Sequence, residues 1–335
     1  MHFPSSVLAL AAAAAGTVNA ASAANTGLKG FNYGAFFLNQ QAKVQADFAY
    51  EFNRAKTMPG TSGWTSARLY TMGRSFTFVG EMRVTDIFFL VQWGTASNVI
   101  QAIPAAIDTN TKLLLGLWIS GGPQAITNEI TALKAAINQY GTKFTDLVVG
   151  ISVGSEDLYR DAAGEVGTSA KYLLDCISKV RTAVANTGLS NVPIGHVDTY
   201  DSFLNGSNSA VIPAIDWVGF DGYPYWESTK PNSIGDAETR FYDGFNKTLK
   251  LAGNKPVWVT ETGWPVTGKT NNLAVASAAN ARIYWQDIAC SLISKKVNLF
   301  WYDLQESQWG TADPDFGIYG AGDLGQLQPR YSLAC

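Results

Sequence analysis

The sequence predicts an α/β protein, a single-domain (β/α)8 TIM barrel, from two observations. Eight short apolar runs rich in β-forming residues occur along the 335 residues. The segments between these runs have the apolar spacing of amphipathic helices. Eight strands that alternate with helices are what this barrel requires. No Pro/Ser-rich linker or block of charge divides the chain, so we expect one barrel domain over residues 24–335.

The chain begins with a predicted secretory signal peptide, residues 1–23. Its apolar run VLALAAAAAG is followed by small residues, with cleavage possible after Ala20 or Ala23. The run is too short to cross a bilayer. We therefore expect a secreted, extracellular protein. Asn205 and Asn246 each begin a glycosylation sequon, which is compatible with an exported glycoprotein.

The eight predicted strands are separated by segments long enough for helices. In order they are 28–34 (LKGFNYG), 66–71 (SARLYT), 112–118 (KLLLGLW), 146–153 (DLVVGISV), 192–197 (VPIGHV), 216–222 (DWVGFDG), 256–261 (PVWVTE) and 298–303 (NLFWYD). Among the intervening segments, 125–141 and 169–188 have helical apolar spacing. Each ends at a glycine suited to a helix C-cap.

Residues 73–90 (GRSFTFVGEMRVTDIFFL) do not fit this alternation, and we treat them as a suspect insertion in the barrel domain. They lead into the apolar run IFFLV, which would make a ninth strand. A closed eight-stranded barrel has no place for one. The segment is either an excursion beside the barrel or sequence translated from a retained intron, and an ordered hairpin over the barrel rim is the alternative.

Composition excludes several classes of function. The net charge of −3 comes from interspersed positive and negative residues, which argues against nucleic acid and anionic membranes as partners. The chain lacks P-loop, GxGxxG, CxxC and HExxH patterns, so neither a metal nor another cofactor is implied. The three cysteines are too few for a disulfide scaffold, although one pair is possible. His196 lies within a strand run, where a hydrogen-bonded core histidine is expected.

Two glutamates at predicted strand ends indicate the chemistry. Functional residues of a (β/α)8 barrel lie at the C-terminal ends of its strands. Glu156 follows the fourth run and Glu261 ends the seventh. Two carboxyl groups that face each other across a barrel mouth are typical of glycoside hydrolysis. The structural alternative is that each glutamate forms only a salt bridge, to an arginine such as Arg68 or Arg160.

The motifs around both glutamates resemble one known family. VWVTETGWP (257–265) resembles the nucleophile segment of family 17 glycoside hydrolases, the endo-β-1,3-glucanases of fungi and plants. VGISVGSEDLYR (149–160) resembles the fungal form of the acid/base segment, and the resemblance extends from GFNYGAFF to FWYDLQES. It implies a retaining (β/α)8 enzyme in which Glu156 is the acid/base and Glu261 the nucleophile.

The same resemblance implies a set of sugar-binding residues. These are Tyr33, Tyr70, Ser155, Tyr223, Trp264, Trp301 and Glu306. Two departures from the family pattern affect this set. Relatives commonly carry asparagine where Ser155 stands, and the stretch QESQWG around Glu306 differs from the usual FDE.WK.

The resemblance therefore implies a monomeric, secreted or cell-wall enzyme that cleaves β-1,3-glucan by double displacement. A raised pKa would keep Glu156 protonated, and Glu261 would act as an ionised nucleophile. One alternative is a β-1,3-glucanosyltransferase that uses a sugar hydroxyl as the acceptor. The other is a non-catalytic wall protein that binds β-1,3-glucan.

Overall fold

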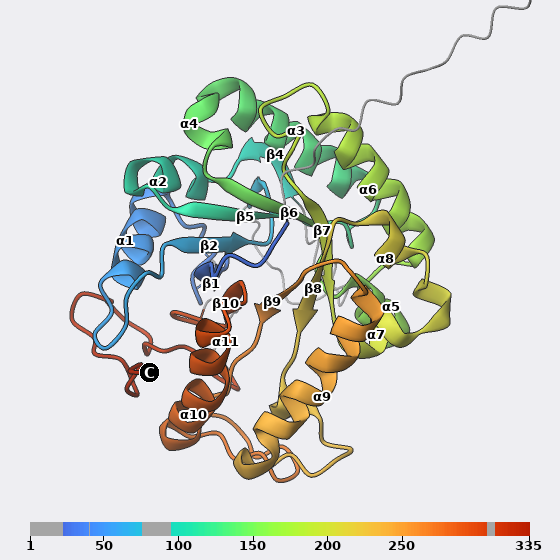
Figure 1. Ribbon diagram of the computed structural model, residues 1–335. Helices are drawn as coiled ribbons and strands as arrows, with labels where there is room; N and C mark the ends of the chain where they lie inside the picture. Colours follow the sequence, from blue (N-terminus) through green and yellow to red (C-terminus); the bar gives the residue numbers. More distant parts are fainter. Residues whose placement is uncertain (1–22, 40, 76–94, 307–311) are drawn as a thin grey trace, which may run out of the picture.

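The fold is a closed barrel of eight parallel strands surrounded by helices (Figure 1). The computed structural model describes residues 23–335, apart from 40, 76–94 and 307–311. Around the barrel the strand order is β1-β10-β9-β8-β7-β6-β5-β2. The strands are β1 (Lys29–Tyr33), β2 (Ser66–Leu69), β5 (Lys112–Leu117), β6 (Val148–Val153), β7 (Ile194–Asp198), β8 (Trp217–Asp221), β9 (Val257–Glu261) and β10 (Leu299–Trp301). All eight coincide with the predicted runs, so the predicted fold is confirmed.

The helices form the outer wall, with α3, α6 and α9 the longest (Figure 1). The α-helices are α1 (Gln45–Lys56), α2 (Ala102–Thr109), α3 (Pro123–Tyr140), α4 (Thr142–Thr145), α5 (Asp157–Ala162), α6 (Ala170–Val184), α7 (Tyr200–Leu204), α8 (Val211–Ala214), α9 (Ile234–Ala252), α10 (Ala278–Tyr284) and α11 (Cys290–Ser294). Three short helical turns are η1 (Gly206–Asn208), η2 (Pro224–Trp226) and η3 (Trp285–Ala289). In the described residues, no helix has the length and apolar character needed to cross a membrane.

The predicted glycine caps hold for one helix and not the other. Helix α3 begins with Pro123 and ends at Gly141, whose φ of 53° lies in the left-handed region that glycine tolerates. Helix α6 ends earlier than predicted, with Ala185 at the C-cap. The prediction of a cap at Gly188 is therefore wrong, because the helix ends in a turn in which the Thr187 N–H donates to the Val184 carbonyl, before Gly188.

A second, two-stranded sheet lies outside the barrel order. Strands β3 (Gly73–Ser75) and β4 (Thr95–Val99) pair in antiparallel fashion. They bracket residues 76–94, which contain most of the suspected insertion and lie outside the described residues. The expectations for 73–90 therefore stay predictions.

Aromatic side chains fill both the barrel and its shell. Trp217 and Trp258 stack with their ring centroids 4.3 Å apart, in a cluster with Leu114, Val197 and Phe300.

A disulfide joins Cys290 to Cys335, and Cys176 is a buried free thiol. This pairing fixes the C-terminal residue to helix α11.

Candidate active site

Both predicted glutamates lie where parallel strands of the barrel end. Glu261 is the last residue of β9, and Glu156 stands three residues beyond the C-terminal residue of β6, at the N-cap of α5. One oxygen of each, together with one oxygen of Asp221, lies within 4.8 Å of the others. The barrel thus brings carboxyl groups far apart in the sequence to one mouth.

The loop VGSED gives Glu156 an unusual backbone. Glu156 has φ 55° and ψ 24°, in the left-handed region that non-glycine residues rarely adopt. A hydrogen bond from its N–H to the Val197 carbonyl, at 2.8 Å, holds it there. Gly154 before it has φ 78°, and a Cβ there would collide with the Asp157 carboxylate. Strain of this kind persists where the surroundings over-determine it, commonly at functional sites.

Glu261 is surrounded by hydrogen-bond donors. Its Oε1 accepts from Arg68 Nη1 at 2.5 Å and from the Tyr70 hydroxyl at 2.7 Å. Its Oε2 accepts from the Tyr223 hydroxyl at 2.8 Å. Because the Glu261 side chain is only 10% exposed, these donors replace the water that an ionised carboxylate would lose. The site is built to hold Glu261 as a charged group.

Arg68 connects Glu261 to the rest of the site. Its side chain is 1% exposed. The guanidinium also donates to Asn32 Oδ1 at 2.8 Å and to Ser155 Oγ at 2.9 Å. Asn32 in turn donates to the carbonyls of Thr260 and Phe300. Arg68 is therefore locked in place between β1, β9 and the loop after β6.

Glu156 has a different environment. Its Oε2 accepts from Arg160 Nη2 at 3.0 Å, and Arg160 is 44% exposed. Burial, together with the nearby negative charge of Glu261, raises the pKa of Glu156 to about 7, against the smaller opposing effect of Arg160. Glu156 thus keeps its proton to much higher pH than an ordinary glutamate.

The ion pairs that the structural alternative anticipated are present. Arg68 pairs with Glu261 and Arg160 pairs with Glu156, as that alternative anticipated. The pairs do not displace the carboxyl groups from one another, since those still converge at the mouth. Ion pairing and convergence coexist at this site.

Asp221 was missed by the sequence analysis. It is the last residue of β8, is 2% exposed, and pairs in register with Glu261 on the neighbouring strand. Its run, DWVGFDG, places a carboxylate at a strand end, which is the same signal that identified Glu156 and Glu261. A search of every strand end for carboxylates would have found it.

The remaining predicted sugar-binding residues divide into two groups. Tyr70, Tyr223 and Ser155 contact Glu261 or Arg68 directly, as described above. Burial and the charge of Glu261 raise the pKa of both tyrosines well above the ordinary range, so both hydroxyls stay protonated as donors. These three residues lie at the site.

The other four predicted residues are buried away from these contacts. Tyr33 packs edge-on against Phe52, while Glu306 accepts from Tyr302 and from the Phe316 N–H. Trp264 is 1% exposed and donates to the Val275 carbonyl, and Trp301 is 0% exposed and packs on Trp285. Since neither tryptophan exposes a ring face, the structure favours packing roles for both. Each ring fills space between the barrel and its helices.

Two other polar residues near the site have structural partners. His196 is fully buried, with Nδ1 on the Val153 carbonyl and Nε2 on Asp198, which is the core role predicted for it. Asp157 accepts from the Ser155 N–H and from the Ser120 hydroxyl. Both residues brace the loop that carries Glu156.

The grouping of Glu156, Asp221 and Glu261 could in principle hold a metal ion. The two guanidinium groups weigh against it, because Arg68 and Arg160 already supply the positive charge for two of the three carboxyl groups. The residues present do not fit a metal centre.

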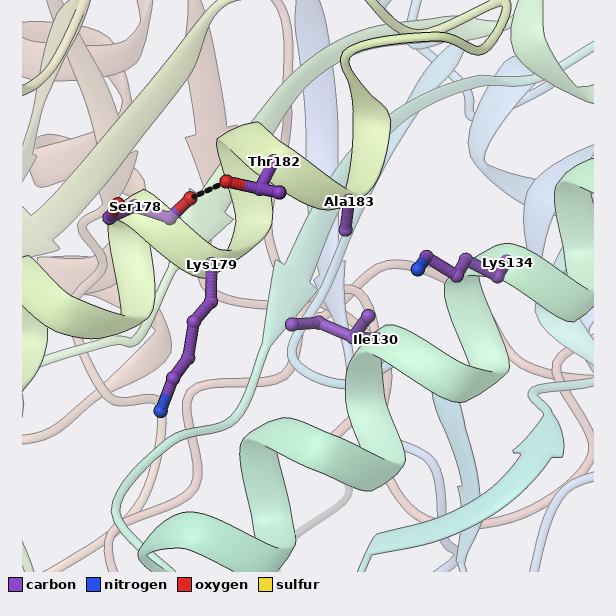
Figure 2. Close-up of a pocket in the computed structure, with 6 residues that line it drawn as sticks. All are labelled: Ile130, Lys134, Ser178, Lys179, Thr182 and Ala183. Carbon is purple, nitrogen blue, oxygen red and sulfur yellow. Dashed lines mark hydrogen bonds between the residues drawn. The ribbon is translucent and has the colours of Figure 1, made fainter.

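A surface groove between α3 and α6 is remote from this chemistry. Figure 2 shows its lining by Ile130, Lys134, Ser178, Lys179, Thr182 and Ala183. A side-chain hydrogen bond runs from the Thr182 hydroxyl to the Ser178 carbonyl, one helical turn apart. The groove has no carboxylate and lies on the outer wall of the barrel.

Comparison with known proteins identifies the family. The model of the BtgE/BtgC glycoside hydrolase domain matches residues 89–320. A probable glucan endo-1,3-β-glucosidase of Aspergillus fumigatus is 51% identical over 313 residues, which cover 92% of this chain and 65% of that protein. A glucan 1,3-β-glucosidase of Saccharomyces cerevisiae is 29% identical, over 71% of this chain and 77% of that protein.

Solved structures show the same fold. A glycoside hydrolase family 17 β-1,3-glucanosyltransferase from Rhizomucor miehei superposes with a TM-score of 0.71 at 23% identity, covering 93% of this chain and 99% of the other. The chain spans only 63% and 65% of the length of the Aspergillus oryzae and Aspergillus fumigatus relatives. From the family match and these relatives, the chain belongs to the BtgE/BtgC glycoside hydrolase family.

Proposed function

We propose that this domain is a retaining glycoside hydrolase that cleaves β-1,3-glucan by double displacement, with Glu156 as acid/base and Glu261 as nucleophile. The observation that carries the proposal is the close approach of their carboxyl oxygens, within 4.8 Å. Retaining glycosidases hold their carboxyl groups about 5–5.5 Å apart, whereas inverting ones need about 6.5–9.5 Å to admit a water. The substrate is proposed from the names of the Aspergillus and yeast relatives.

In the first step, Glu261 attacks the anomeric carbon and forms a covalent ester. The bond from that carbon to the glycosidic oxygen breaks, and the leaving oxygen takes the proton of Glu156. In the second step, Glu156 removes a proton from water, the water oxygen bonds to the anomeric carbon, and Glu261 leaves as a carboxylate. The charged environment of Glu261 and the raised pKa of Glu156 suit these roles.

The residues around Glu261 have proposed roles as well. Tyr70 and Tyr223 orient its carboxylate and lie where a sugar ring must approach. Ser155 accepts a hydrogen bond from Arg68 and so helps to hold the guanidinium beside Glu261. For Tyr33, Trp264, Trp301 and Glu306, a direct sugar contact stays a prediction, and their burial favours a supporting role.

The test is a reducing-sugar assay on β-1,3-glucan, with β-1,4-glucan as the control polysaccharide. NMR of the first product should show the β-anomer if configuration is retained. An α-anomer as first product would refute double displacement. Glucan binding with no release of reducing ends would support the non-catalytic alternative.

The second candidate function is β-1,3-glucanosyl transfer. The observation that favours it is the superposition with the Rhizomucor miehei β-1,3-glucanosyltransferase, one form of which contains laminaritriose. Transfer needs the same two glutamates, with a sugar hydroxyl in place of water. Product sizing on laminari-oligosaccharides separates the two, because only transfer yields products longer than the substrate.

We also propose that the protein is secreted, to the medium or the cell wall, and acts as a monomer. Asn205 and Asn246 are both exposed and available for glycosylation. A mobility shift on treatment of the exported protein with an N-glycosidase tests this, and an unglycosylated intracellular protein would contradict it.

A further inference from the structure

Asp221 is a third carboxyl group at the site, and the proposed reaction gives it no task. It ends β8, next to Glu261 on β9, and one of its oxygens lies within 4.8 Å of both Glu156 and Glu261. Its Oδ1 accepts a hydrogen bond from the Thr260 hydroxyl at 2.7 Å. Its Oδ2 is shielded from solvent and has no hydrogen-bond partner among the described residues.

The positive charges nearby are already committed to other groups. Arg68 donates to Glu261, Ser155 and Asn32, and Arg160 donates to Glu156. No ion pair to Asp221 occurs within the part of the chain that the structure describes. An ionised Asp221 would therefore be a buried charge without a cation, beside two other carboxyl groups.

The groups that face Asp221 come from several neighbouring strands of the barrel, and burial and the two glutamates among them favour its neutral form. Glu261 and Thr260 lie on β9, Glu156 follows β6, and Arg68 projects from β2. On β7, Asp198 is bonded to His196. Burial, and then the charge of Glu261, raise the pKa of Asp221 well above its ordinary range, against a smaller opposing effect of Arg68.

We propose that Asp221 is a neutral carboxylic acid in both steps of the reaction, and a positioning residue for the single negative charge that moves between Glu261 and Glu156. The inference rests on the proposed function. Before the first step the charge is on Glu261, and Glu156 holds the proton. In the glycosyl-enzyme, Glu261 is an uncharged ester and Glu156 is the carboxylate.

Asp221 thus has one charged carboxylate within 4.8 Å at every stage. Repulsion from that charge keeps Asp221 protonated throughout, and its O–H dipole adds polarity without adding charge. At every stage, only one of the three carboxyl groups carries a negative charge.

The direct test is carbon-13 NMR of protein labelled at the aspartate carboxyl carbons, with Asp221→Asn to assign the resonance. We expect the shift of a protonated carboxyl, unchanged between about pH 5 and 7. The same shift is expected in Glu261→Gln, which imitates the uncharged ester and leaves the charge on Glu156. A carboxylate shift for Asp221 in either protein would overturn the proposal. If Asp221→Asn does not fold, Asp221→Glu provides the assignment by loss of the same resonance.

The kinetic test is the alkaline limb of the kcat/KM profile, which reports loss of the Glu156 proton. Asp221→Asn should lower kcat, because an amide NH2 group replaces the carboxyl O–H beside the two glutamates. It should leave the pH of the alkaline limb unchanged, because the amide is neutral, as we propose Asp221 to be. If Asp221 is ionised instead, its loss removes a negative neighbour and moves the limb down by roughly one pH unit or more. That result would overturn the proposal. If the wild-type protein cleaves no β-1,3-glucan, the proposed function fails, and the NMR measurement still decides the charge of Asp221.

Discussion

Replacing Glu156 by glutamine should stabilise the protein, increasingly so as the pH rises. The pKa of Glu156 is raised from 4.5 to about 7, chiefly by burial. Below about pH 4.5 the group is protonated in both the folded and the unfolded chain, so its ionisation does not change the free energy of unfolding. As the pH rises toward 7, the unfolded chain ionises first, and the free energy of unfolding falls. A displacement of this size corresponds to at most about 3 kcal/mol, and the side chain's 17% exposure reduces it.

The measurement is urea unfolding of wild type and Glu156→Gln at about pH 4.5 and pH 8. We expect the stability advantage of the variant to grow by about 2–3 kcal/mol between these conditions. The matched control is Glu165→Gln, which removes the other carboxylate that pairs with Arg160, on the exposed side. Its unfolding is measured in parallel as the reference for an exposed carboxylate beside Arg160. A Glu156→Gln advantage that is flat or shrinks with pH would refute the electrostatic account of Glu156.

Four further variants test other parts of the site, and one deletion tests the suspected insertion. Glu261→Ala should abolish turnover but retain glucan binding, and azide should partly restore activity with an inverted product; substantial unaided turnover would contradict the nucleophile role. Arg68→Met should destabilise the fold by about 3–5 kcal/mol in urea unfolding, because it leaves a buried carboxylate unpaired, whereas an unchanged midpoint would mean that the ion pair is not buried in solution. Arg160→Ala should move the alkaline limb of the pH–rate profile upward by about 0.2–0.7 pH units, since a half-exposed cation that favours ionised Glu156 is lost; Arg160→Lys should move it less, and a downward shift would reverse our assignment. A chain lacking 73–90 should fold, and sequencing of transcripts should reveal a spliced message without that segment; a spliced message that retains it and a deletion that does not fold would show that the segment belongs to the protein.

The strands were predictable because parallel barrel strands are buried on both faces. Each reads as a continuous apolar run, and eight such runs leave few alternatives to a barrel. The convergence of Glu156 and Glu261 followed from topology alone, since strand ends of a barrel meet at one mouth. No knowledge of side-chain contacts was needed for either result.

The sequence named Arg68 only as a candidate ion-pair partner for either glutamate and could not assign it to Glu261. Arg68 lies 193 positions from Glu261, and its run SARL gives no sign that the arginine points inward. The fates of the aromatic residues were also undetermined. Trp301 packs against Tyr284 and Trp285 in the helical shell, while Tyr223 donates a hydrogen bond to Glu261. Residue type predicts an aromatic contact, but only the register of each strand decides which side the ring faces.

The chain directly after Tyr70, a donor to Glu261, is held by a buried carboxyl group that bonds to it ahead of the suspected insertion. Glu129 on α3 is fully buried and accepts from the Thr71 hydroxyl at 2.5 Å and from the Met72 N–H at 2.6 Å. These bonds fix the chain directly after Tyr70, before β3 begins. A buried carboxyl group without hydrogen-bond partners destabilises the fold, so breaking these two bonds to Glu129 is unfavourable. Variation in length beyond Gly73 can therefore occur without moving the Tyr70 hydroxyl away from Glu261.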